Sequence, residues 1–134
     1  MDFNKYVGLP YRHKGRDASG VDCWGLVRLF CKQELGVELP SFNGVYYTTD
    51  TEFVGEGANE IRKSLSDILI KTEDPKPGDI CRFNIIGYPI HVGIVCDARH
   101  FLHVEEFKNA NIARYDRNPW NKRISEFYHV RTDD

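Results

Sequence analysis

The chain has 134 residues, 41% of them hydrophobic, which is enough for one domain with its own core. Its 18 Lys and Arg residues nearly balance 20 Asp and Glu residues, so the composition argues against nucleic acid or an anionic membrane surface as a partner. Charged residues near the N-terminus and the lack of a long apolar stretch predict a soluble single domain, residues 1–134, made in the cytoplasm without an export signal.

The first predicted element is a helix preceded by an ordered loop. Glycines and clustered charges over residues 1–20 favour the loop. The helix is expected to run from about Cys23 to about Leu35, because apolar residues recur there at helical spacing. Ser19 and Asp22 are candidate N-caps, and Gly36 stands where a left-handed stop is favoured.

The rest of the chain predicts mainly strands. The pattern between Phe42 and Asp74 is weak, with a short strand expected over 45–49 and a helix over 58–70. After a turn at 76–79, runs rich in β-branched and aromatic residues predict strands at 80–86, 90–96 and 101–107. Residues 124–130 are expected to form a last strand or a short packed segment. One helix ahead of a mostly antiparallel sheet is an α+β domain.

Four cysteines are present, Cys23, Cys31, Cys81 and Cys96, without a C-x-x-C pair. Their spacing predicts neither a disulfide framework nor a structural zinc site. Reduced thiols are therefore expected, and Cys31, Cys81 and Cys96 are interpreted as core residues.

Cys23 differs because it begins the predicted helix. Backbone N–H groups of a first helical turn, together with a neighbouring imidazolium, stabilise a thiolate and can hold an oxyanion. His91 and His103 lie on successive predicted strands and share a face if the turn centres near residues 97–98. Gly93 leaves the His91 side of its strand bare, so the helix with Cys23 is expected to pack there.

Taken singly, a cysteine in a helix or a histidine on a strand is more often structural than catalytic. The combination of Cys23, His91 and His103, in that order, favours a thiol hydrolase. A zinc site on the same three residues is the chemical alternative, although no fourth ligand is evident. The remaining histidines, His13, His100 and His129, are interpreted as surface residues.

Several fragments, in this order, resemble the NlpC family of bacterial cell-wall peptidases. They are Gly8-Leu9-Pro10-Tyr11, Asp22-Cys23-Trp24-Gly25-Leu26-Val27, Leu39-Pro40, Pro77-Gly78-Asp79, His91-Val92-Gly93-Ile94 and Phe101-Leu102-His103. The resemblance covers most of the chain. It implies a papain-like fold and hydrolysis of the γ-D-glutamyl to diamino acid bond in peptidoglycan stem peptides, with no metal or other cofactor.

The resemblance also implies roles for individual residues. Cys23 would be the nucleophile, His91 the general base and His103 the residue that orients His91. Tyr11 would lie beside the nucleophile, and Asp22 would help to anchor the amino end of the stem peptide. From the residues alone, Tyr11 could equally be a packed loop aromatic and Asp22 only a helix cap.

Two features depart from the usual family pattern. Trp24 stands where the family usually has serine, which implies a reshaped pocket beside Cys23, and the stretch between Cys23 and His91 is longer than in short members. Trp24 and Arg28 resemble the version in bacteriophage tail-tip assembly proteins, which implies a virion component with other tail proteins as partners. A catalytically idle tail assembly or binding module, and a papain-like amidase or acyltransferase, remain as alternatives.

Overall fold

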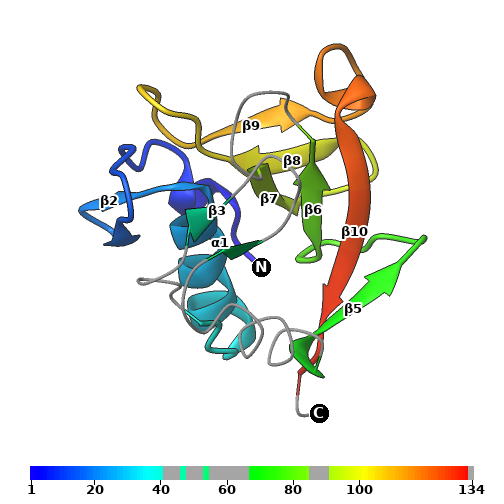
Figure 1. Ribbon diagram of the computed structural model, residues 1–134, viewed down its shortest axis with the longest axis horizontal. Helices are drawn as coiled ribbons and strands as arrows, with labels where there is room; N and C mark the ends of the chain where they lie inside the picture. Colours follow the sequence, from blue (N-terminus) through cyan, green and yellow to red (C-terminus); the bar gives the residue numbers. More distant parts are fainter. Residues whose placement is uncertain (41–45, 48–52, 55–66, 85–90, 133–134) are drawn as a thin grey trace.

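A computed structural model describes residues 1–40, 46–47, 53–54, 67–84 and 91–132 of the chain (Figure 1). Within these residues, six antiparallel strands form one sheet in the order β5-β10-β6-β7-β8-β9, and helix α1 lies beside it. The strands are β5 (Leu69–Thr72), β6 (Ile80–Phe83), β7 (His91–Val95), β8 (His100–His103), β9 (Asn111–Arg114) and β10 (Ile124–Val130). The predicted α+β class is confirmed. None of the described helices is long and apolar enough to cross a membrane.

Helix α1 (Cys23–Phe30) forms where the sequence predicts it. The Asp22 carboxylate accepts a hydrogen bond from the Gly25 backbone N–H at 2.7 Å, which satisfies one donor of the first turn. A π-helical turn, η2 (Cys31–Leu35), continues the helix, and Gly36 ends it with φ of +69°.

The segment before α1 is more regular than the predicted loop. It contains a 3-10 turn, η1 (Asn4–Tyr6), and a short hairpin of β1 (Arg16–Asp17) and β2 (Gly20–Val21). The hairpin approaches the helix so closely that a Cβ on Gly25 would lie 1.9 Å from the Gly15 carbonyl oxygen. The bare glycine therefore lets the hairpin pack directly on the first turn of α1.

Gly25→Ala is expected to lower the free energy of unfolding by about 2 kcal/mol or more, because the added methyl group would meet backbone atoms that cannot move alone. Gly36→Ala is the matched control. Its Cβ would have nothing within 4 Å, and only the left-handed φ of +69° would cost about 1 kcal/mol. Urea denaturation of both variants measures the difference, and an equal loss in the two would contradict the close packing at Gly25.

Each face of the sheet carries its own apolar cluster. Helix α1 packs on the face formed by Val92, Ile94 and Leu102. The opposite face carries a second cluster of Cys81, Phe83, Val95, Phe101 and Trp120.

The expectation that α1 would pack on the Gly93 side of β7 is therefore wrong. The amphipathic helix needs an apolar surface, which Val92 and Ile94 supply on the other side. The space above Gly93 is already taken, because a Cβ there would lie 2.9 Å from the Phe101 ring.

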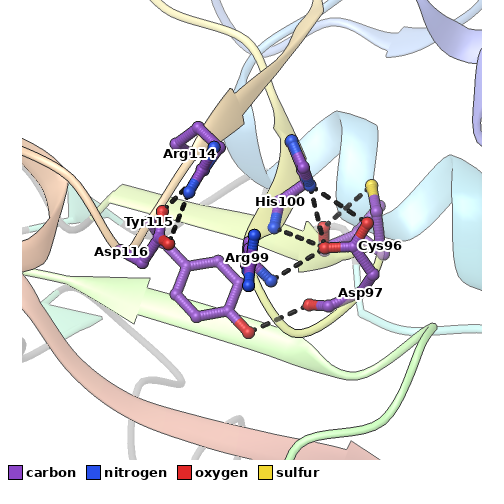
Figure 2. A network of polar contacts seen from close by, with 8 residues as sticks. Cys96, Asp97, Arg99, His100, Arg114, Tyr115 and Asp116 are labelled. Carbon is purple, nitrogen blue, oxygen red and sulfur yellow. Dashed lines mark hydrogen bonds and ion pairs between the residues drawn. The ribbon is translucent and has the colours of Figure 1, made fainter.

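The turn between β7 and β8 is held by one aspartate (Figure 2). One carboxylate oxygen of Asp97 accepts the backbone N–H groups of Arg99 and His100, each at 2.8 Å, and lies 2.9 Å from His100 Nδ1. The Tyr115 hydroxyl donates to the Asp97 carbonyl oxygen at 2.9 Å. These bonds fix the turn and with it the register, in which Ile94 pairs with Leu102.

Several predicted boundaries need correction. Strand β8 ends at His103 rather than residue 107, and Phe107 has a left-handed φ of +66°. The helix predicted over 58–70 is wrong at its end, because β5 begins at Leu69 and pairs with β10. Strand β9 was not predicted.

Other predicted boundaries lie partly outside the described residues. Residues 58–66 of the predicted helix are outside them, as are residues 85–90 between β6 and β7. In the strand predicted over 45–49, only β3 (Tyr46–Tyr47) is described, and it pairs with β4 (Phe53–Val54). Strand β10 has the bounds that the sequence predicts.

Candidate active site

Cys23 is the first residue of α1 and is half-buried where the helix meets β7. The backbone N–H groups of Val92 and Trp24 hydrogen bond its sulfur. Burial raises the pKa of the Cys23 thiol to about 12, the Asp22 carboxylate raises it further, and the two N–H groups and Arg16 act in the opposite direction. The thiolate expected from the sequence is therefore not the resting form at neutral pH.

His91 and His103 form a directly hydrogen-bonded pair. His91 Nε2 and His103 Nδ1 lie 2.9 Å apart, and the two residues are only 8% and 1% exposed. This geometry confirms the predicted face sharing. Burial lowers the pKa of His91 to about 4 and that of His103 to about 3, so both imidazoles are neutral at pH 7.

The Cys23 sulfur lies at the first residues of β7, the strand that begins with His91. Because Val92 follows His91 directly, the amide that bonds the Cys23 sulfur is adjacent to the histidine. Helix α1 packs on one face of the sheet, and the two imidazoles lie with the aromatic residues of the other face. The chemistry available here is a nucleophile at a helix N-terminus and a buried proton acceptor on the neighbouring strand.

The two other residues predicted near the thiol, Tyr11 and Asp22, differ in their surroundings. Tyr11 is half-buried against the first core cluster, and its pKa is raised by burial and then by the charges of Glu106, Asp22 and Cys23. A place for Tyr11 beside the nucleophile stays a prediction.

Asp22 is buried and fully engaged as the helix cap. Besides Gly25, its carboxylate binds the Arg16 guanidinium at 2.8 Å and the Lys14 backbone N–H at 3.2 Å. Asp22 therefore caps helix α1, as one of its two predicted roles requires, whereas contact with a substrate amine stays a prediction. Arg16 was not identified from the sequence, although an arginine six residues before a capping aspartate is compatible with an ion pair.

Trp24 lies in the core rather than on an open wall beside the thiol. It is 4% exposed, and its indole N–H donates to the Pro40 carbonyl oxygen at 2.7 Å. Its visible role is to attach the segment after the helix to α1. An influence of Trp24 on substrate choice stays a prediction.

Trp24→Ser is consequently expected to destabilise the domain by about 3 kcal/mol or more, since it empties a core position and leaves the Pro40 carbonyl without its donor. Trp24→Phe should retain most of the packing and lose mainly the hydrogen bond. Thermal melting of the two variants tests this. A serine variant that melts like the wild type would mean that Trp24 is not a core residue.

Trp120 and two phenylalanines, Phe83 and Phe101, surround the histidine pair, and none of the three was identified from the sequence. Trp120 begins a 3-10 turn, η3 (Trp120–Lys122), and is 8% exposed. Its ring centroid lies 5.3 Å from that of His91 and 4.9 Å from that of His103. The only signal in the sequence is an isolated aromatic residue in a polar stretch.

Within the described part of the chain, no group of three His, Cys, Asp or Glu residues is arranged to hold a metal ion. All four cysteines are free, and Cys31 and Cys81 are fully buried, as predicted. Cys96 is only partly buried. His13 and His129 are exposed and His100 is intermediate.

Comparison with known proteins identifies relatives over nearly the whole chain. The NlpC/P60 family model matches residues 8–129. The Escherichia coli K12 protein named murein DD-endopeptidase MepS/murein LD-carboxypeptidase is 28% identical over 121 residues, which are 90% of this chain and 55% of that protein. The chain thus spans about half the length of the curated relatives that it matches.

Solved structures share the fold. The NlpC/p60 domain of peptidoglycan hydrolase SagA matches with a TM-score of 0.60 and 23% identity, over 97% of this chain and 92% of that chain. An NlpC/P60 family protein from Bacillus cereus ATCC 10987 matches with a TM-score of 0.65 and 17% identity, over 93% of this chain and 36% of that chain. The family match over residues 8–129 shows that this chain belongs to the NlpC/P60 family, and the solved structures share its fold.

Proposed function

We propose that this domain is a cysteine peptidase that hydrolyses peptide bonds in peptidoglycan. The observation that carries the proposal is the hydrogen bond of 2.9 Å between His91 and His103, at the strand end where the Val92 amide bonds Cys23. A buried neutral imidazole beside a thiol is a competent proton acceptor, and a second imidazole can orient it. The name of the Escherichia coli relative, a murein endopeptidase and carboxypeptidase, supports the substrate class.

The mechanism follows from the neutral resting state. As a substrate carbonyl approaches, Cys23 passes its proton to His91 Nδ1 and attacks the carbonyl carbon. The oxyanion then receives hydrogen bonds from the Cys23 backbone N–H and from the Tyr11 hydroxyl. His91 next donates the proton to the leaving amine, and finally activates a water molecule that hydrolyses the acyl-enzyme.

This sequence of steps assigns a tautomer to each histidine. Because Nδ1 of His91 must accept the thiol proton, the ring carries its own hydrogen on Nε2 and donates it to His103 Nδ1. His103 therefore orients the base and stabilises the imidazolium that forms. Asp22 is proposed to contribute to binding the amino end of the stem peptide, through the electrostatic field of its carboxylate.

We further propose the γ-D-glutamyl to diamino acid bond as the target, on the resemblance of the motifs around Cys23 and His91. Product analysis distinguishes cleavage of this bond from the endopeptidase and carboxypeptidase activities that the relative's name gives. Purified tripeptide, tetrapeptide and cross-linked muropeptides would be incubated with the domain and examined by mass spectrometry. Cleavage after D-glutamate supports the proposal. Loss of a terminal D-alanine, or opening of the cross-link alone, would indicate carboxypeptidase or DD-endopeptidase activity instead.

The motif that includes Trp24 and Arg28 supports a place in a bacteriophage tail, where the enzyme would open the host wall and contact other tail proteins. Proteomic analysis of purified virions from a producing strain tests this placement. Presence of the chain at a stoichiometry similar to that of tail proteins is expected. Its absence from particles, together with its presence in uninfected cells, would indicate a cellular enzyme.

A further inference from the structure

Trp120 contacts both imidazoles of the candidate active site and is itself held by a cation. Its ring stacks on His91 with an interplanar angle of 23°, and it meets His103 edge-on at 81°. The Arg123 guanidinium carbon lies 5.2 Å from the centroid of the Trp120 ring. Arg123, Trp120 and His91 are thus consecutively in contact, and Trp120 covers two histidines at once.

Two phenylalanines complete the enclosure. The ring centroid of Phe83 lies 5.7 Å from that of His91, and the centroid of Phe101 lies 4.3 Å from that of His103. Both phenylalanine rings also contact Trp120, with centroid distances of 5.2 Å for Phe83 and 5.4 Å for Phe101. The three aromatic residues form a buried cage, defined here as Phe83, Phe101 and Trp120. Of the three, Trp120 alone belongs to an irregular segment rather than to a strand of the sheet.

We propose that Trp120 is a positioning residue of the active site, which holds the hydrogen-bonded imidazole pair in one orientation and keeps water from it. This inference rests on the proposed function of His91 as the base. Core packing alone does not require a flat ring against His91 and its edge against His103. Both contacts restrict rotation of the imidazole rings. The hydrogen bond between His91 Nε2 and His103 Nδ1 persists only if the rings keep this orientation.

The groups around each imidazole act on its pKa in opposite directions. An indole face attracts an imidazolium, which would raise the pKa of His91, whereas burial and the charge of Arg123 lower it. Burial outweighs the attraction, since the pKa of His91 lies at about 4, below its ordinary value of 6.5. Burial, then the charge of His91 and then that of Lys108 lower the pKa of His103, and Asn111 acts in the opposite direction.

Removing the indole should therefore return the pKa of His91 toward its ordinary value. Only neutral His91 can accept the thiol proton, so the pH at which activity is lost on the acidic side should rise together with the pKa of His91. In Trp120→Leu, the midpoint of the His91 titration is expected to move upward by about one pH unit, and in Trp120→Phe by about half as much. Activity at pH 5, relative to that of the same protein at pH 7, should follow the order Trp, Phe, Leu.

The test is an NMR titration of the imidazole ring protons, with the His91 signal identified by its absence in His91→Ala. Phe127→Leu is the matched control, because Phe127 packs on Tyr115 at 5.7 Å and pairs with Cys81 rather than with His91. That variant should melt at a lower temperature with unchanged midpoints. The titration needs no substrate, so it remains decisive even if the domain cleaves no peptidoglycan.

Unchanged His91 and His103 midpoints in Trp120→Leu, in a protein that melts cooperatively, would overturn the proposal. If the leucine variant does not fold, the phenylalanine variant decides. A normal titration together with normal activity in that variant would mean that Trp120 serves only to pack the core.

Discussion

Replacing Cys23 by alanine is expected to abolish hydrolysis, with a fall in kcat of about 10⁴-fold or more, while the domain stays folded. The sulfur is the only group at the start of α1 that can form the acyl-enzyme. The side chain is half-buried and sits in a first helical turn, where alanine is well tolerated. Circular dichroism and thermal melting measured beside the activity separate loss of chemistry from loss of structure.

Cys31→Ala is the matched control because it removes a thiol two turns along the same helix. Cys31 is fully buried in the first core cluster and does not reach the histidines. This variant should lose about 1 kcal/mol of stability and keep its turnover per folded molecule. A Cys23 variant with wild-type turnover would show that the nucleophile is elsewhere.

His91 and His103 are expected to have unequal importance. His91→Ala removes the proton acceptor and should lower kcat by about 10³-fold or more. His103→Gln can still accept the Nε2 hydrogen of His91 through its amide oxygen, so activity should fall by only about 10 to 100-fold. Steady-state kinetics on one purified muropeptide measures all variants under the same conditions.

His103→Leu is the decisive comparison. It fills a similar volume in a site that is 1% exposed, but leaves the His91 N–H buried without an acceptor, at a cost of about 1 to 3 kcal/mol. Its activity should fall well below that of the glutamine variant. Equal losses in the two variants would mean that His103 does not act as a hydrogen-bond acceptor for His91.

The histidine pair could be predicted from the sequence because strand geometry alternates with a period of two. The run from His91 to Cys96, the short turn at Asp97 and the strand that ends at His103 leave few possible registers. The predicted sharing of a face is confirmed by the 2.9 Å contact. Helix α1 and the π-helical turn η2 that continues it were equally predictable, because Asp22 marks the start of α1 and Gly36 the end of η2.

The side on which the helix packs could not be obtained in the same way. Gly93 appears bare in the sequence, and only the structure shows that the Phe101 ring occupies its space. Trp120 was missed for a related reason, since an aromatic residue in an irregular segment has no periodic signal. The neutral resting state of Cys23 also depends on burial, which local sequence does not specify.

One comparison tests the central claim most directly: the rate at which new amino termini appear in purified peptidoglycan treated with the wild-type domain and with Cys23→Ala, at equal concentrations of folded protein. Wild-type protein is expected to release amino termini at a single type of peptide bond, and the alanine variant to release none above background. Equal release by the two proteins, or none by the wild type on any muropeptide, would contradict a cysteine peptidase centred on Cys23, His91 and His103.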